Sequence, residues 1–91
     1  MKYLICYDIP ETKKRTKVVK FLQTFSYRIQ YSVFLGEGDR REIETAKIRL
    51  QNLLEESPKS RVMIVPLTEE NVKTWWMLGI VLEEKKDCLI A

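Results

Sequence analysis

The chain contains no histidine, and this absence removes a large part of enzyme chemistry. Catalytic triads that pair Ser or Cys with His are excluded, as are zinc sites built on imidazole ligands. The only cysteines, Cys6 and Cys88, lie too far apart in sequence for a CxxC ligand or redox pair. We expect both to be ordinary packed thiols. Any chemistry performed by this chain would therefore use mainly carboxylates and a hard metal ion.

Glycine and proline are scarce, with three of each, and low-complexity stretches and long hydrophobic runs are absent. The chain should therefore fold compactly rather than remain disordered. The first apolar run, residues 3–7, is too short for a membrane span and lacks the features of a signal peptide. We expect a cytoplasmic protein that has no membrane partner. Its 91 residues form one domain, near the size at which a partner subunit covers some apolar surface.

Positive charge is concentrated in the first half of the chain. Residues 1–41 contain nine Lys and Arg against four Asp and Glu, whereas residues 42–91 contain seven against nine. Six cations and no acid occur within residues 13–28: Lys13, Lys14, Arg15, Lys17, Lys20 and Arg28. Such a patch suits a polyanion, although a lysine-rich helix face is often only solvated surface.

The first half of the chain predicts a strand followed by an amphipathic helix. Residues 2–8 form an apolar run that ends at Asp8, and Pro10 stops the strand while Thr12 can cap a helix. Helical spacing places one apolar stripe toward a sheet: Val18, Phe21, Leu22 and Phe25. Arg15 belongs to the core-facing side of the first turn, close to Asp8.

The rest of the chain predicts alternating strands and helices. Residues 27–35 are strand, either one bent strand or two short ones, and residues 36–38 break it. Asp39 and Glu42 fit a capping box for a second helix. Residues 61–67 form a further buried strand, in which Pro66 marks either the strand end or a sheet edge. Residues 68–77 form a short helix with Trp75 and Trp76 turned inward.

This order of elements is the α+β, ferredoxin-like pattern βαββαβ, an antiparallel sheet with helices on one face. We assign residues 1–79 to this ferredoxin-like domain. Residues 80–91 form a C-terminal extension of one or more strands within the same single domain. We expect that extension to cross to a dimer mate or a partner, because an apolar strand at a free terminus needs a neighbour.

Asp8 is the leading candidate for chemistry, and two interpretations of it stay open. It could pair with Arg15 or cap the following helix, as a lone strand-end Asp often does. It could instead bind Mg²⁺ or Mn²⁺, which often use one or two carboxylates plus water and substrate phosphates. A two-fold dimer would supply the second carboxylate.

Two further groups of residues have both a structural and a functional interpretation. Arg28 and Gln30 should share one sheet face, where they either form an exposed polar surface or place Arg28 against a phosphate. Trp75 and Trp76 could stack on bases, but core or subunit packing is favoured because little positive charge surrounds them.

Three segments occur together in this chain: Tyr7-Asp8-Ile9, the Arg15-x-Lys17 pair, and Phe-Ser-Tyr-Arg-Ile-Gln-Tyr-Ser-Val-Phe at residues 25–34. In combination they resemble the second core CRISPR-associated protein, the Cas-two family. Chain length and element order also agree, so the resemblance covers essentially the whole chain.

The resemblance implies a ferredoxin-like homodimer that is a metal-dependent endonuclease on RNA or DNA. Such proteins also bridge dimers of the CRISPR integrase, CRISPR-associated protein one, during spacer capture. By position, Asp8 would be the catalytic residue and the ligand of Mg²⁺ or Mn²⁺ at the dimer axis. Six residues would surround it and bind or support nucleic acid: Tyr7, Arg15, Lys17, Arg28, Ser32 and Phe34.

Two alternatives to a CRISPR nuclease remain open at this point. The protein could be a non-catalytic DNA-binding scaffold of the integration complex, with its carboxylates structural. It could also be a related ferredoxin-like ribonuclease toxin of the virulence-associated D type. These alternatives differ in whether a metal-dependent cut occurs and in whether the integrase is bound.

Overall fold

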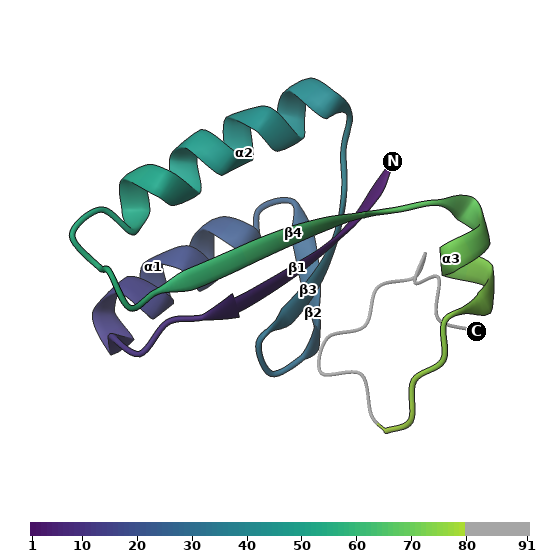
Figure 1. The fold of residues 1–91 in the computed structure, drawn as a ribbon, viewed down its shortest axis with the longest axis horizontal. Helices are drawn as coiled ribbons and strands as arrows, with labels where there is room; N and C mark the ends of the chain where they lie inside the picture. Colours follow the sequence, from purple (N-terminus) through teal and green to yellow (C-terminus); the bar gives the residue numbers. More distant parts are fainter. Residues whose placement is uncertain (80–91) are drawn as a thin grey trace.

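The computed structural model describes residues 1–79, which form a four-stranded antiparallel sheet and three helices (Figure 1). Along the chain the elements are β1 (Lys2–Asp8), α1 (Thr12–Leu22), β2 (Ser26–Gln30), β3 (Val33–Glu37), α2 (Arg40–Leu53), β4 (Arg61–Leu67) and α3 (Glu69–Thr74). The extension expected over residues 80–91 lies outside the described residues.

The sheet has the strand order β2-β3-β1-β4, and every neighbouring pair is antiparallel. α1 therefore connects β1 to β2, which have β3 between them in the sheet, and α2 connects β3 to β4, which have β1 between them. This confirms the predicted α+β, ferredoxin-like fold. β1 occupies a central position, but its last two residues, Tyr7 and Asp8, pair only with β4, because the pairing with β3 ends at Cys6.

One face of the sheet is covered by α1 and α2, which lie along it in Figure 1. Side chains alternate along a strand, so Ile5 and Tyr7 of β1 point to this face together with Phe34 of β3. The predicted stripe of α1 meets them there, with Val18 and Leu22 fully buried. These contacts form the main hydrophobic core.

The opposite face of the sheet, which we call the open face, carries a smaller apolar cluster. Tyr27, Ile29 and Leu35 are buried there, and Leu4, Val33 and Trp75 pack against them. Near β4 the open face is less well covered by residues 1–79, and the Met63 side chain is 58% exposed. No helix of the βαββαβ unit lies on this side within residues 1–79.

The segment predicted as one or two strands is two strands, β2 and β3, joined by a turn at residues 31–32. An irregularity in their pairing lies between Arg28 and Gln30. The predicted break at residues 36–38 is wrong, because β3 continues through Glu37. Gly36 fits within the strand because it lies opposite Ser26, where an added Cβ would come within 3.2 Å of the Ser26 Cβ.

The helix termini agree with the sequence in one case and differ in two. α2 begins with the predicted capping box, in which the Asp39 side chain accepts from the Glu42 backbone N–H at 2.8 Å. α1 does not use Thr12 as its cap, because Glu11 occupies that position without a side-chain bond. The predicted inward orientation of Trp76 is also wrong, since the helix ends at Thr74 and Trp76 is 81% exposed.

β4 lies at an edge of the sheet, one of the two possibilities that Pro66 indicated, but the predicted burial is wrong, because none of its residues is fully buried. An edge strand has a neighbour on only one side, so its residues lose part of their cover.

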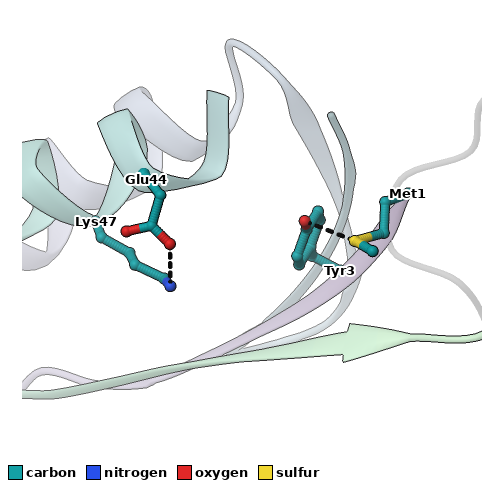
Figure 2. Close-up of polar contacts among 4 residues, drawn as sticks. All are labelled: Met1, Tyr3, Glu44 and Lys47. Carbon is teal, nitrogen blue, oxygen red and sulfur yellow. Dashed lines mark hydrogen bonds and ion pairs between the residues drawn. The ribbon is translucent and has the colours of Figure 1, made fainter. Parts of the chain in front are cut away.

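At the amino end of β1 the Tyr3 hydroxyl lies 2.8 Å from the Met1 sulfur, and on the surface of α2 Lys47 pairs with Glu44 (Figure 2). None of the helices within residues 1–79 has the length and apolar character of a membrane span.

Candidate functional site

Asp8 is exposed to solvent at the carboxyl end of β1. Its backbone lies opposite Arg61 in the pairing of β1 with β4, but its carboxylate forms no ion pair within residues 1–79. The alternative in which Asp8 pairs with Arg15 is therefore not realised there. Glu11, not Asp8, occupies the cap position of α1. Asp8 thus presents a carboxylate that the described part of the fold does not neutralise.

Arg15 bonds to the backbone and to a neighbouring side chain instead. Its guanidinium donates to the Ile9 carbonyl oxygen at 2.9 Å and to the Thr12 hydroxyl at 3.2 Å. The same contact explains why Thr12 does not cap the helix, because its oxygen accepts from Arg15. These two bonds hold a partly buried cation beside the end of β1.

Tyr7 and Asp8 are neighbours in sequence but point to opposite faces of the sheet. Tyr7 is buried beneath α1, and its ring lies 6.2 Å from that of Phe34. Asp8 belongs to the series Leu4, Cys6 and Asp8 on the open face. The end of β1 therefore supplies one residue to each side of the sheet.

A cavity of about 330 Å³ lies between α1 and the β2–β3 turn on the helix-covered face. We call it the α1 cavity, and its lining comprises Tyr7, Arg15, Thr16, Val19, Lys20, Gln23, Arg28 and Tyr31. Three residues predicted from the sequence, Tyr7, Arg15 and Arg28, thus meet in one place. The guanidinium of Arg28 lies over the ring of Phe34, 5.3 Å from its centroid. Such a cation–π contact orients the planar group.

The other predicted residues do not line the α1 cavity. Lys17 is exposed on α1, and Phe34 is fully buried, so it can act only through the Arg28 that it supports. Ser32 lies in the β2–β3 turn, where its carbonyl accepts from the Tyr7 backbone N–H at 3.1 Å. Asp8 lies on the other face. The predicted set is therefore divided between two faces of the sheet.

Three lining residues were not among the predicted site residues: Lys20, Gln23 and Tyr31. The sequence could have identified Lys20 as a site residue, since it belongs to the cationic run of the first helix. No sequence pattern pointed to Tyr31, because its position depends on the turn that separates β2 from β3. A residue expected within a strand is instead at the tip of a hairpin and 72% exposed.

One copy of the chain does not supply a complete metal site within residues 1–79. No group of three His, Cys, Asp or Glu that could hold an ion occurs there. Cys6 lies on the same face as Asp8, but burial raises the pKa of its thiol and so disfavours the thiolate that binds metals. Within residues 1–79 Asp8 therefore offers one hard oxygen donor of the type that Mg²⁺ and Mn²⁺ prefer, and an ion there would need further ligands.

A larger cavity, of about 920 Å³, lies at the other end of β1. Its lining includes Met1, Leu67, Val72 and Trp75, and it is remote from Asp8. Of the two cavities, the smaller one therefore contains predicted site residues, namely Tyr7, Arg15 and Arg28.

Comparison with known proteins assigns the chain to a family. The family model described as "CRISPR associated protein Cas2" matches residues 1–74. A relative from Aeropyrum pernix, named CRISPR-associated endoribonuclease Cas2, is 34% identical over 89 residues, covering 97% of this chain and 96% of its own.

Solved structures have the same fold. Streptococcus pyogenes Cas2 superposes with a TM-score of 0.75 at 25% identity, covering 87% of this chain and all (100%) of its own. A chain of a structure titled "Partial Cas6-RT-Cas1--Cas2 complex" has a TM-score of 0.75 at 20% identity, covering 92% of this chain and 98% of its own. The solved structures show the shared fold, and the family model and the Aeropyrum pernix relative decide between the two ferredoxin-like families considered from the sequence. The chain belongs to the family of CRISPR associated protein Cas2.

Proposed function

We propose that the protein is a Mg²⁺- or Mn²⁺-dependent endonuclease on RNA or DNA that acts as a homodimer in CRISPR spacer acquisition. The observation that carries this proposal is the exposed Asp8 carboxylate at the end of β1, which has no ion-pair partner within residues 1–79. Relatives of the chain are named endoribonucleases or endonucleases, which supports a nuclease function.

The dimer follows from the open face of the sheet. This face exposes Met63 and carries apolar residues that the βαββαβ unit leaves without a helical cover. Two copies that meet through their open faces bury this surface, and a two-fold axis near the end of β1 brings two Asp8 carboxylates together. The pair then provides the two carboxylates with which Mg²⁺ is often bound.

In this arrangement Asp8 from each copy would hold the ion, and Arg15 and Arg28 would bind phosphate charge. A bound divalent ion would supply polarisation of a phosphodiester and a water of lowered pKa. The protein's own part is to hold the flanking phosphates in place. Arg15 is suited to this because its bonds to Ile9 and Thr12 fix the guanidinium before substrate binds.

Replacement of Asp8 tests the nuclease proposal. Asp8→Asn keeps the size of the side chain but removes its charge, so we expect metal-dependent cleavage of a labelled oligonucleotide to fall by at least about 100-fold. Glu11→Gln is the matched control, because Glu11 is a nearby exposed carboxylate without a side-chain cap bond. A folded, dimeric Asp8→Asn protein that cuts as fast as the Glu11→Gln control removes Asp8 from catalysis.

The second candidate is a non-catalytic scaffold that binds duplex DNA for the CRISPR integrase, CRISPR-associated protein one. It is favoured by the lack of a group of three potential metal ligands within residues 1–79 and by the cations of α1. A scaffold should bind DNA with a steep salt dependence and without sensitivity to a chelator. Spacer integration that survives Asp8→Asn, with no cleavage by either protein, selects the scaffold over the nuclease.

A further inference from the structure

The α1 cavity has a positive lining. Arg15, Lys20 and Arg28 contribute cationic side chains, and no Asp or Glu within residues 1–79 lines it. Cations gathered at one site repel one another unless an anion joins them. The remaining lining is aromatic or neutral, so the cavity favours a ligand that combines negative charge with a flat apolar group.

Arg15 is arranged in advance for such a ligand. A guanidinium has five N–H donors, and the two bonds to Ile9 and Thr12 leave others for a ligand. Those two bonds also restrict the side chain, so little rotational freedom is lost when an anion binds. Lys20 lies more than one helical turn further along α1 and adds a flexible point charge. Together they suit the oxygens of a phosphate.

Tyr31 provides a flat surface beside these cations. Its ring is 72% exposed, while its backbone is held by Tyr7, whose hydroxyl donates to the Tyr31 carbonyl at 3.2 Å. The Tyr7 backbone N–H bonds to Ser32 at 3.1 Å, which fixes the other half of the turn. An exposed aromatic ring on a fixed backbone can stack on a nucleobase and loses little conformational entropy when it does so.

We infer that the α1 cavity is a subsite for one nucleotide of a single-stranded nucleic acid, with phosphate bound by Arg15, Lys20 and Arg28 and a base stacked on Tyr31. This inference rests on the proposed function insofar as the protein must bind nucleic acid. The volume of about 330 Å³ is near the lower end for ligand sites, which suits a single nucleotide.

The position of the α1 cavity explains why a single strand fits better than a duplex. The cavity lies on the helix-covered face, whereas Asp8 lies on the open face at the same end of β1. A nucleic acid that occupies both must turn around the end of the sheet. A single strand bends over that distance easily, but a duplex is stiff on this scale.

Two single substitutions, each with a matched control, test the subsite. Tyr31→Ala is compared with Trp76→Ala, because Trp76 is another exposed aromatic and lies at the other end of β1. Lys20→Ala is compared with Lys13→Ala, which removes the same charge from the same helix outside the cavity. Binding of a fluorescent single-stranded oligonucleotide is measured by anisotropy, with chelator present so that no cleavage occurs.

We expect Tyr31→Ala to weaken binding by about fivefold or more, and Tyr31→Phe and Trp76→Ala to retain it. Lys20→Ala should weaken binding more than Lys13→Ala, which removes only the general attraction of one helix cation. Equal effects of each variant and its control overturn the subsite but leave the proposed function in place. A wild-type protein that binds no oligonucleotide either with chelator or with Mg²⁺ overturns both, so the two failures are distinct.

Discussion

The two faces of the sheet differ in how completely the chain covers them. On the helix-covered face Ile5 and Phe34 are fully buried beneath α1 and α2. On the open face the cluster around Ile29 is smaller, and Met63 remains 58% exposed. A chain of this size can close one side of a four-stranded sheet with its own helices. The other side keeps exposed apolar surface within residues 1–79, and in the proposed dimer it is the side that associates.

The candidate site residues are divided between the two faces in the same way. The α1 cavity collects Arg15, Arg28 and Tyr31 on the helix-covered face, and Asp8 stands on the open face. In the proposed function, phosphate binding and metal binding therefore belong to different sides of one strand end. Substitutions on the two faces should consequently affect different properties: stability on one side, and association on the other.

The largest effect on stability is expected from Phe34→Ala. Removal of this fully buried ring leaves a cavity in the main core, and we expect the free energy of unfolding to fall by about 3–5 kcal/mol. Urea denaturation at constant protein concentration measures the change. Met63→Ala on the open face is the comparison, with an expected loss below about 1 kcal/mol. Similar losses for the two variants would show that both faces are equally closed.

The next effect concerns association. Met63→Lys places a charge on the open face, and in the proposed dimer that charge would be buried, so we expect the dimer to dissociate at least about tenfold more readily. Ile48→Lys is the control, because Ile48 is 60% exposed on α2. Sedimentation velocity over a range of concentrations separates the two variants. A dimer weakened equally by both substitutions contradicts association through the open face.

A smaller loss of stability is expected from a change at the start of α2, one of the two helices that cover the sheet. Asp39→Ala removes the side-chain acceptor of the capping box at the start of α2, and we expect a loss of about 1 kcal/mol in the free energy of unfolding. Asp39→Asn, which keeps an acceptor, should lose less. If both variants unfold at the wild-type urea midpoint, the cap does not limit the stability of the helix-covered face.

The smallest effect belongs to the exposed pair of Lys2 and Glu37, which joins β1 and β3. The hydrogen bond from Lys2 and its charge lower the pKa of Glu37 from its ordinary value of 4.5. Because the folded-state pKa is lowered, any stabilisation is present above pH 4.5 and is lost as pH falls through the lowered value. The pair is exposed, so salt should weaken it.

Glu37→Gln checks this pH dependence. The variant should unfold at slightly lower urea than wild type at pH 7 and low ionic strength, and the two proteins should converge at acid pH. A difference that persists unchanged at acid pH, or in high salt, would mean that Glu37 acts through packing and not through its charge.

Sequence patterns predicted most of the fold because they report local and periodic constraints. The capping box of Asp39 and Glu42 and the buried positions of Val18 and Leu22 depend on residues within one helix. Predictions failed where a distant or competing contact decided the outcome. Thr12 accepts from Arg15 instead of capping α1, and Gly36 continues β3 because Ser26 lies opposite.

The sequence by itself determined the ferredoxin-like order of elements, the cationic run of α1 and the placement of Asp8 at the end of β1. These features follow from side-chain periodicity and from the residue types that begin and end helices and strands. Only the tertiary structure decided that Tyr7 and Asp8 serve opposite faces with different surroundings, and that Tyr31 lies beside Arg28 in one cavity. Such relations depend on strand order and register, which bring together residues that no local pattern connects.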